Sequence, residues 1–353
     1  MRVAVVGAGV TGLACAWRLA QTGVTVTLFE PDPNRAASRV AAGMLAPLTE
    51  AHPTEPGLLA AGRAALERWP AFAGALAESA IDPGYQVAGT LVIGYDADDL
   101  AALDEFGGRL GGFGVAAERL TGSACRALEP ALAPGIRGGL SIPGDHSVDN
   151  RALLRALWEA CSAAGVAVNT AEVESLDLDA DVVVVATGAW VGRLLPEFAN
   201  LVRPVRGEIV RLTAGRHTPR LTRTVRAIVE GRGVYLVPRA TGELVVGATQ
   251  EEVGFDRTVT AGGVHRLLAD SRRVLPAVDE YGLIETAAGL RPVSRDGAPL
   301  IGRVAPGLVV AAGHGRNGLL FAPFTAELVC AAVRGDEPYP AFDPARFGAV
   351  APR

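Results

Sequence analysis

The sequence predicts an α/β fold in two lobes, one Rossmann-like and assembled from three chain segments, the other built on a mostly antiparallel β-sheet. Three observations predict it. The N-terminus has the pattern of strand, glycine-rich turn, helix and strand; α/β patterns return in the middle and at the C-terminus; and two β-rich stretches interrupt them. We therefore place the first lobe in residues 1–82, 144–201 and 286–353, and the second in residues 83–143 and 202–285.

The chain opens with MRVAVVGAGVTGLACAWRLAQTGVTVTLFE. Val3 to Val6 form a short apolar run, as expected of a buried parallel strand. Leu13, Trp17 and Ala20 recur at helical spacing, and Gly23 is a suitable helix end. The run VTVTLF then predicts the second strand.

The same patterns predict the later elements. We expect paired strands within residues 85–95 and a hairpin within 233–249, around Ala240-Thr241-Gly242. We expect further helices at 96–112, 147–166, 262–276 and 318–333, and further strands at 179–190, 202–213, 224–230 and 307–313.

Composition narrows the class of protein. The chain has 353 residues, 49% apolar and 20% charged, which is typical of a soluble globular protein. A net charge of −5 argues against a nucleic-acid-binding surface, and the lack of a long apolar run argues against a membrane span. Four scattered cysteines predict neither a disulfide framework nor a metal site. Because the apolar start runs straight into a folded motif, we expect no secretory leader and a cytoplasmic protein.

The first stretch carries a G-x-G-x-x-G motif at Gly7, Gly9 and Gly12. The following strand ends in an acid, Glu30, which lies 18 residues after Gly12. In such motifs the first glycine permits a tight turn, the second lets the backbone approach a pyrophosphate, and the third lets helix pack on strand. The acid accepts hydrogen bonds from ribose hydroxyls. The motif predicts a bound dinucleotide but does not separate FAD from NAD.

A second run of small residues, ASRVAAGMLAP, occupies positions 37–47. Ser38 is a candidate helix cap or phosphate contact. The Ala-Ala-Gly at 41–43 would let the backbone pass close to a flat ring. The alternative is an ordinary alanine-rich helix start, against which Gly43 and Pro47 count.

Near the C-terminus, Arg291 stands directly before Pro292. A residue before proline is held extended, so we expect Arg291 at the end of a strand or just after it. Further on, VVAAGHGRNGLL predicts a strand, a glycine-rich turn and a helix. The positive end of such a helix suits a flavin edge that becomes anionic on reduction, whereas a nicotinamide enzyme has no use for a second such turn. This turn therefore favours a flavin.

The whole chain resembles the FAD-dependent D-amino-acid oxidase superfamily, and most closely the glycine oxidases of thiamine biosynthesis. The matching pieces keep the family order over nearly the full length: GAGVTGLACAWRLA, AAGML, SVDNRALLRAL, VVVVATGAW, VYLVPRATGELVVGAT, GLRPVSRDGAPLIG and GHGRNGLLFAPFTAELV. The resemblance implies noncovalent FAD and a small amino acid as substrate: glycine, sarcosine or a D-amino acid. A hydride would move to flavin N5 without a general base, and O2 would then yield H2O2. The product would become an α-keto acid and ammonia or enter thiazole formation. A homo-oligomer is also implied.

The resemblance implies roles for individual residues as well. Arg291 would pair its planar fork with the substrate α-carboxylate, and Tyr235 would donate its phenol to the same group. Arg316 would lie over the substrate face of the flavin. The residues implied in FAD binding are Gly7, Gly9, Val10, Thr11, Gly12, Glu30, Ser38, Ala41, Ala42, Gly43, Met44, Val173, Gly188, Trp190, Arg291, His314, Gly315, Arg316, Asn317, Gly318 and Leu319.

Three positions depart from the family pattern and leave the substrate open. Relatives usually carry an aromatic residue at Gly315, a bulkier polar residue at Gly233 and often a methionine at Gln250. These changes predict a pocket that admits substrates larger than glycine. Two further functions stay open: a dehydrogenase of the same fold that passes electrons to a quinone or protein, and a non-catalytic FAD-binding subunit of a complex.

Each central side chain also has a plain structural alternative. Arg291 is alternatively a surface ion-pair partner, and Tyr235 a half-buried strand tyrosine, which is common in sheets. His314 is better explained as a turn histidine satisfied by its neighbours than as a catalytic base.

Overall fold

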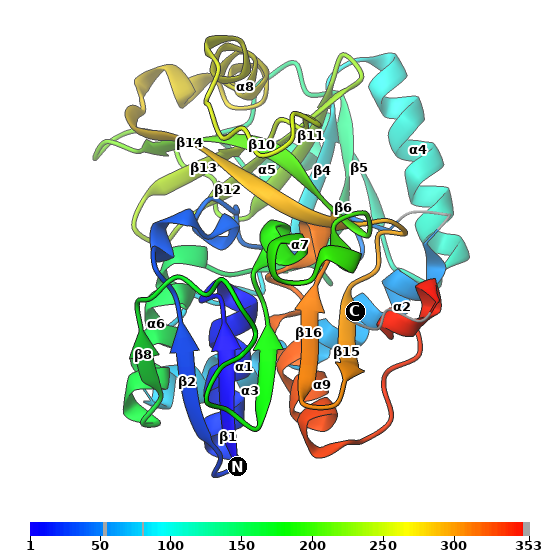
Figure 1. The fold of residues 1–353 in the computed structure, drawn as a ribbon. Helices are drawn as coiled ribbons and strands as arrows, with labels where there is room; N and C mark the ends of the chain where they lie inside the picture. The colour runs from blue at the N-terminus through cyan, green and yellow to red at the C-terminus, as the bar shows by residue number, and fades with distance from the viewer. Residues whose placement is uncertain (52–54, 80, 349–353) are drawn as a thin grey trace.

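The computed structural model describes residues 1–51, 55–79 and 81–348. Its elements form two large sheets (Figure 1). The first has six strands in the order β15-β16-β9-β1-β2-β8, all pairs parallel except β15 with β16. The strands are β1 (Arg2–Val6), β2 (Thr25–Phe29), β8 (Ala167–Asn169), β9 (Val182–Val185), β15 (Leu300–Ala305) and β16 (Leu308–Ala312).

Both faces of the central part of the six-stranded sheet are covered, which explains why β9 and β16 are unbroken apolar runs that are buried at every residue. Val3 and Val5 point to one face, where they pack against helices in a single core cluster. Ala4 and Val6 point to the other face, toward Val191 of the short helix α7 (Val191–Leu194). The helices of the first face are α1 (Val10–Gln21), α2 (Pro56–Glu67), α3 (Trp69–Ser79), α6 (Asn150–Ala163) and α9 (Ala322–Arg334), with α1 in contact with both α6 and α9.

The second sheet has eight strands in the order β14-β10-β13-β12-β11-β4-β6-β5. It is antiparallel except for the pair β11 with β4. The edge strand β14 continues through residue 286, where sequence analysis placed a lobe boundary. The strands are β4 (Thr90–Gly94), β5 (Glu118–Thr121), β6 (Gly138–Ile142), β10 (Val202–Thr213), β11 (Thr224–Val229), β12 (Arg232–Pro238), β13 (Glu243–Gly247) and β14 (Gly282–Ser294).

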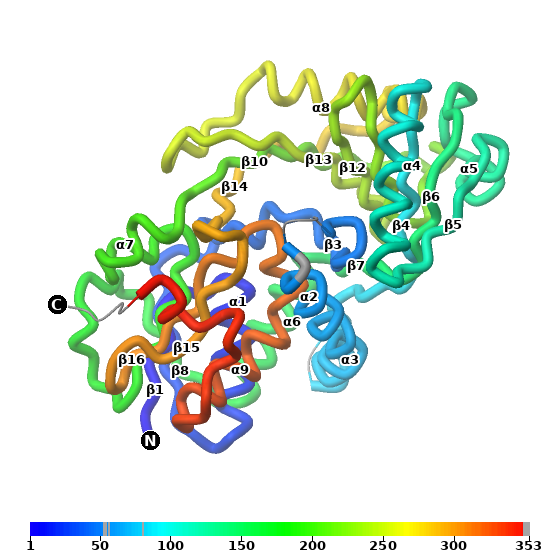
Figure 2. Tube along the Cα trace, turned by 90° about the vertical axis from the view of Figure 1, so that its right-hand side faces the viewer, coloured from blue at the N-terminus to red at the C-terminus, as the bar shows by residue number. Residues whose placement is uncertain are grey.

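Helices cover this sheet unequally. On the outer face, α8 (Ala261–Val274) contacts β10, β12 and β13, with α5 (Gly122–Leu128) against β6. On the inner face, α4 (Ala97–Gly112) covers only the part around β4 and β6. Figures 1 and 2 both place the uncovered inner face over the carboxyl ends of β1, β2 and β9. A small sheet of β3 (Met44–Leu45) and β7 (His146–Ser147) completes the described strands. Parallel α/β sheets bind ligands at the carboxyl ends of their strands.

Most predicted elements are present, and several have different bounds. Residues 85–95 hold one sheet strand, β4, because Gly89 has a positive φ of 76° that interrupts the extended backbone before it. The strand expected at 179–190 ends at Val185, and a 3-10 turn follows at Gly188–Trp190. The predicted helix 147–166 begins only at Asn150, because the Asp149 carboxylate caps it by accepting from Arg151 and Ala152.

Two C-terminal predictions need correction. Arg291 lies inside β14 and not at its end, because Pro292 stands opposite Pro204 on the edge strand, where a missing N–H is tolerated. The final helix begins at Ala322 and not at residue 318, with Pro323 in its first turn, a favoured place for proline. The turn after β16 therefore leads into the 3-10 turn Gly315–Asn317 before the regular helix.

Among the described residues, no helix is long and apolar enough to span a membrane. The same part of the chain holds no cluster of three or more His, Cys, Asp or Glu side chains suited to a metal ion.

Candidate active site

A cavity of about 780 Å³ lies between the carboxyl ends of β1, β2 and β9 and the inner face of the eight-stranded sheet. It brings together residues from all parts of the chain. Gly233 and Gln250 line it, as does every predicted site residue except Gly12: Gly7, Gly9, Val10, Thr11, Glu30, Ser38, Ala41, Ala42, Gly43, Met44, Val173, Gly188, Trp190, Tyr235, Arg291, His314, Gly315, Arg316, Asn317, Gly318 and Leu319.

The three glycines of the N-terminal motif are needed for different reasons. Gly7 has a φ of 101°, and a Cβ there would lie 2.6 Å from the Ala186 carbonyl oxygen. A Cβ on Gly12 would lie 1.7 Å from the Gly7 carbonyl oxygen, so this position serves the packing of α1 on its turn. At Gly9 a Cβ would meet only the Ser38 Oγ, at 3.7 Å. The missing side chain at Gly9 therefore leaves space to the cavity and is not required by the protein's own packing.

The N-terminus of α1 opens on this cavity. Its first turn carries no acidic residue, and its N-cap, Gly9, supplies no side-chain cap. The Val10 amide donates instead to Ser38 Oγ at 3.2 Å, so Ser38 caps a helix 28 residues earlier in the chain. The Glu30 carboxylate accepts from the amides of Ala8 at 2.8 Å and Asp32 at 3.0 Å, which holds it at the end of β2. A helix start with its positive end toward a cavity is a site for anions.

The segment around Gly43 is held by a group of buried side chains that sequence analysis missed. The Asn150 Nδ2 donates to the Ser38 carbonyl at 2.7 Å, and Arg239 donates to the Ala42 carbonyl. Arg211 donates to Asn150 Oδ1 at 3.1 Å. Arg211 and Arg239 are buried, and burial lowers the pKa of Arg239 to about 10. The sequence contained a signal for Arg211 and Arg239, because each arginine interrupts an apolar run within a predicted strand.

Tyr235 and Arg291 enter the cavity from different strands of the inner sheet face. Two strand glycines make room for them: a Cβ on Gly247 would lie 2.4 Å from the Tyr235 Oη, and one on Gly207 would lie 2.4 Å from the Arg291 guanidinium nitrogens. Burial raises the pKa of Tyr235, against the opposing effect of Arg291 and Arg226, so the phenol keeps its proton and can donate. Glycine within a strand commonly marks a close approach of this kind.

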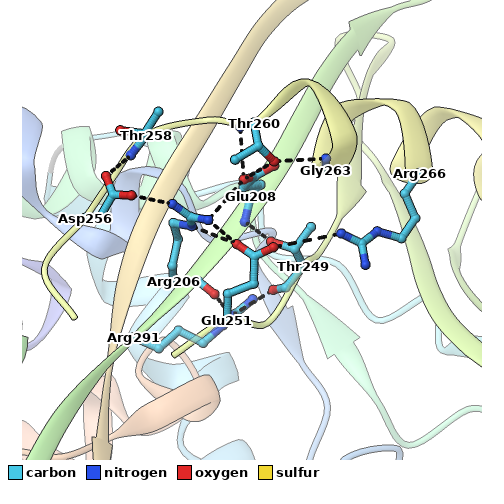
Figure 3. Close-up of polar contacts among 10 residues, drawn as sticks. All are labelled: Arg206, Glu208, Thr249, Glu251, Asp256, Thr258, Thr260, Gly263, Arg266 and Arg291. Atoms are coloured by element: carbon cyan, nitrogen blue, oxygen red, sulfur yellow. Dashed lines mark hydrogen bonds and ion pairs between the residues drawn. The ribbon is translucent and has the colours of Figure 1, made fainter. Parts of the chain in front are cut away.

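Backbone carbonyls hold the Arg291 guanidinium, and among the described residues it has no carboxylate within ion-pair distance. Its Nη1 donates to the Thr249 carbonyl at 3.2 Å and to the Arg206 carbonyl at 3.5 Å. Figure 3 shows the network behind it, in which Arg206 binds the carboxylates of Glu251 and, at 2.9 Å, Asp256. The Arg206 and Glu251 backbones also pair with each other. The network thus fixes the two backbone groups that orient Arg291.

The side chain of Arg316 is held by two carboxylates. Its Nε lies 2.7 Å from a Glu50 carboxylate oxygen, and its Nη2 lies 3.0 Å from Glu55. Glu50 also pairs with Arg226 of β11. Arg226 and Glu50 line the cavity and were both missed, although a lone arginine in the apolar run TVRAIVE was a usable signal.

The turn after β16 supplies backbone to the cavity. His314 is buried, and its Nε2 lies 2.9 Å from Thr325 Oγ1. Burial lowers the pKa of His314 to about 4, so the ring is neutral near pH 7 and is satisfied by its neighbour. Gly315 has a φ of 55°, and a Cβ there would meet nothing within 4 Å. A Cβ on Gly233 would also meet nothing within 4 Å, so both sites face open space.

Residues 2–332 match the model of a family described as FAD dependent oxidoreductase, DAO. The chain belongs to this family. The predicted resemblance is thereby confirmed, and so is FAD as the cofactor.

Individual relatives agree. The chain is 35% identical to the glycine oxidase of Geobacillus kaustophilus, over 98% of this chain and 95% of that protein. The crystal structure of the glycine oxidase from that organism matches with a TM-score of 0.88 at 34% identity, over 99% and 98% of the two chains. The bifunctional protein ThiO/ThiG of Nostoc sp. is 32% identical over 93% of this chain, which spans about half (52%) of that relative's length. The iminodiacetate oxidase of Chelativorans sp. BNC1 is 26% identical with a TM-score of 0.85, over 100% of both chains.

The residues of the cavity fit FAD. The α1 N-terminus is suited to the pyrophosphate, and Gly9 leaves the space that a close phosphate requires. The Thr187 Oγ1, in the cavity wall, is buried without a hydrogen-bond partner among the described residues, as expected of a group whose partner is a ligand. The turn at residues 314–319 lines the same cavity and offers it backbone amides and carbonyls.

Proposed function

We propose that the protein is an FAD-dependent amino-acid oxidase of the glycine-oxidase type, which deaminates glycine, sarcosine or a D-amino acid. The observation that carries this proposal is the pair of Arg291 and Tyr235 in the same cavity as the nucleotide-binding turn. A cationic fork and a protonated phenol make a site for one carboxylate. A small amino acid is the substrate class that such a site selects.

The chain's own residues act by binding and orientation. Arg291 binds the substrate carboxylate, and Tyr235 donates its hydroxyl to the same group. No side chain is required to act as a base: His314 is neutral and bound to Thr325, and Glu50 is paired with two arginines. Holding one conformer of the substrate lowers the entropic part of the barrier. FAD, when bound, supplies the hydride acceptor, with O2 as the final oxidant and H2O2 as a product. The imine product leaves and is hydrolysed to an α-keto acid and ammonia, or methylamine where the substrate is sarcosine.

FAD itself would be held by two groups of residues. Those near the pyrophosphate and adenosine are Gly7, Gly9, Val10, Thr11, Gly12, Glu30, Ser38 and Val173. Those near the flavin are Ala41, Ala42, Gly43, Met44, Gly188, Trp190 and Arg291, together with His314, Gly315, Arg316, Asn317, Gly318 and Leu319. In this proposal residues 1–82, 144–201 and 286–353 form the FAD-binding domain, and residues 83–143 and 202–285 the substrate-binding domain. A role in thiazole formation is supported by the names of the ThiO relatives.

The test is an anaerobic screen of the purified holoenzyme with glycine, sarcosine and D-amino acids. We expect bleaching of the flavin spectrum by at least one of them and, in air, one H2O2 per amino acid consumed. Bleaching without O2 uptake would instead support a dehydrogenase that uses a quinone or protein acceptor. If none of these amino acids bleaches the flavin, the proposed function is wrong.

A further inference from the structure

Three arginines line the substrate end of the cavity: Arg226, Arg291 and Arg316. Two of them are paired with carboxylates. Arg226 pairs with Glu50, and Arg316 pairs with Glu50 at 2.7 Å and with Glu55 at 3.0 Å. Among the described residues, Arg291 has hydrogen bonds only to backbone carbonyls. Three positive and two negative charges leave one positive charge, and that charge is on Arg291.

Glu50 holds this arrangement together. One of its oxygens faces Arg226 and the other Arg316, which come from β11 and from the turn after β16. Burial raises the pKa of Glu50, but Arg226 and Arg316 outweigh it and hold that pKa below its usual value. Glu50 is therefore ionised near neutral pH. Its side chain is 19% exposed, so solvent screens its charges only weakly.

Arg226 stands next to the carboxylate site. It lies directly opposite Tyr235 in the antiparallel pair of β11 and β12, so the two side chains point to the same face of the sheet. The pairing with Glu50 turns Arg226 from a second cation beside Tyr235 into half of a neutral pair. Both residues of this pair line the cavity.

We propose that Glu50 is a specificity-determining residue that restricts the substrate to amino acids with one carboxylate. The inference rests on the proposed function and adds the substrate class to it. A second carboxylate on the substrate would meet an arginine already neutralised and, beside it, the negative charge of Glu50. A substrate with one carboxylate needs only Arg291 and Tyr235. Glu50 therefore works by repulsion and by occupying Arg226, and specificity commonly depends on such unfavourable contacts.

The test compares holoenzymes of wild type and Glu50→Gln. For binding, the probes are the unreactive acids glycolate (one carboxylate) and diglycolate (two), followed through the flavin absorbance. For turnover, the probes are glycine and D-alanine against iminodiacetate and D-aspartate. We expect Glu50→Gln to tighten diglycolate relative to glycolate by about tenfold or more, because a freed arginine forms a charge-assisted hydrogen bond. The ratio of kcat/KM should shift toward the dicarboxylates through KM.

Three variants separate this role from a structural one. Glu55→Gln is the matched control, since Glu55 pairs with Arg316 but not with Arg226 and lies outside the main cavity, so the ratio should stay at the wild-type value. Glu50→Asp keeps the charge and should restore the wild-type preference. Adding Arg226→Gln to Glu50→Gln should abolish the gain.

An unchanged diglycolate-to-glycolate ratio in Glu50→Gln would overturn the inference, and so would an equal gain in Glu55→Gln. If Glu50→Gln does not fold, the inference is decided by Arg226→Gln alone. In that variant Glu50 keeps only Arg316 as a cavity partner, so its negative charge should weaken diglycolate relative to glycolate, and an unchanged ratio would overturn the inference. Carboxylate binding with the expected ratios but no oxidation of any amino acid would count against the proposed function and not against this inference.

Discussion

Replacing Arg291 by alanine removes the one arginine, of the three at the substrate end of the cavity, that has no carboxylate partner among the described residues. A guanidinium fork makes two charge-assisted hydrogen bonds to a carboxylate, each contributing about 1.5–3 kcal/mol. Arg291 is half-buried, so we take the lower value, and the pair contributes about 3 kcal/mol. The expected loss in substrate affinity is about 100-fold.

Arg291→Ala should keep its flavin, because the N-terminus of α1 and the many other residues proposed to hold FAD are unchanged. The assay is the rate of anaerobic flavin reduction against amino-acid concentration, with flavin content measured from the released chromophore. Arg291→Lys should recover only part of the affinity, because an ammonium lacks the planar fork. Arg203→Ala is the matched control, since Arg203 lies on β10, is 51% exposed and pairs with Glu252. If Arg291→Ala and Arg203→Ala show the same half-saturating concentration as wild type, Arg291 does not bind the carboxylate.

Three further predictions follow from the geometry. Gly9→Ala should weaken FAD binding and leave the melting temperature of the apoprotein near that of wild type. Gly12→Ala should lower the melting temperature, because its Cβ would lie 1.7 Å from a carbonyl oxygen. Equal losses of melting temperature in the two variants would contradict the role given to Gly9. Arg206→Met should raise KM far more than it lowers kcat, because Arg206 fixes the carbonyls that orient Arg291. Arg206→Lys should recover part of the wild-type KM. A change in kcat alone would show that Arg206 does not act by positioning Arg291. Burial lowers the pKa of His314 in the fold to about 4, below its usual value of 6.5, so the ring stays neutral in the fold while the unfolded chain takes up a proton. Its contribution to stability is present above pH 6.5 and is lost as the pH falls toward 4, by about 3 kcal/mol in total. Denaturant unfolding of wild type and His314→Gln between pH 4 and 7.5 should therefore converge at low pH, and parallel curves would refute this.

Local patterns were predictable because their causes are local. The strand, turn and helix around Gly7 and Gly12 follow from apolar periodicity and from positions that admit no Cβ. The hairpin of β12 and β13 was found for the same reason. The predicted site residues line one cavity because the motif marks the carboxyl end of β1, where the fold places its ligands.

Predictions failed where a distant partner decides the outcome. Arg291 was placed at a strand end because its proline neighbour was read locally, yet Pro204 across the sheet lets β14 continue past it. No local pattern showed what the Arg316 side chain contacts, because the carboxylates that engage it lie more than 260 residues earlier in the chain.

The sequence by itself predicted the nucleotide-binding turn and the membership of a flavin family, since these depend on residue type and short spacing, and it led to the proposal of Arg291 as the carboxylate-binding arginine. Only the tertiary structure decided which arginine is free. Glu50 and Arg226 are 176 residues apart in the chain, and no periodicity links them. The charge of a buried site is the sum over groups that the fold brings together, so it is a property of the assembled pocket and not of any segment.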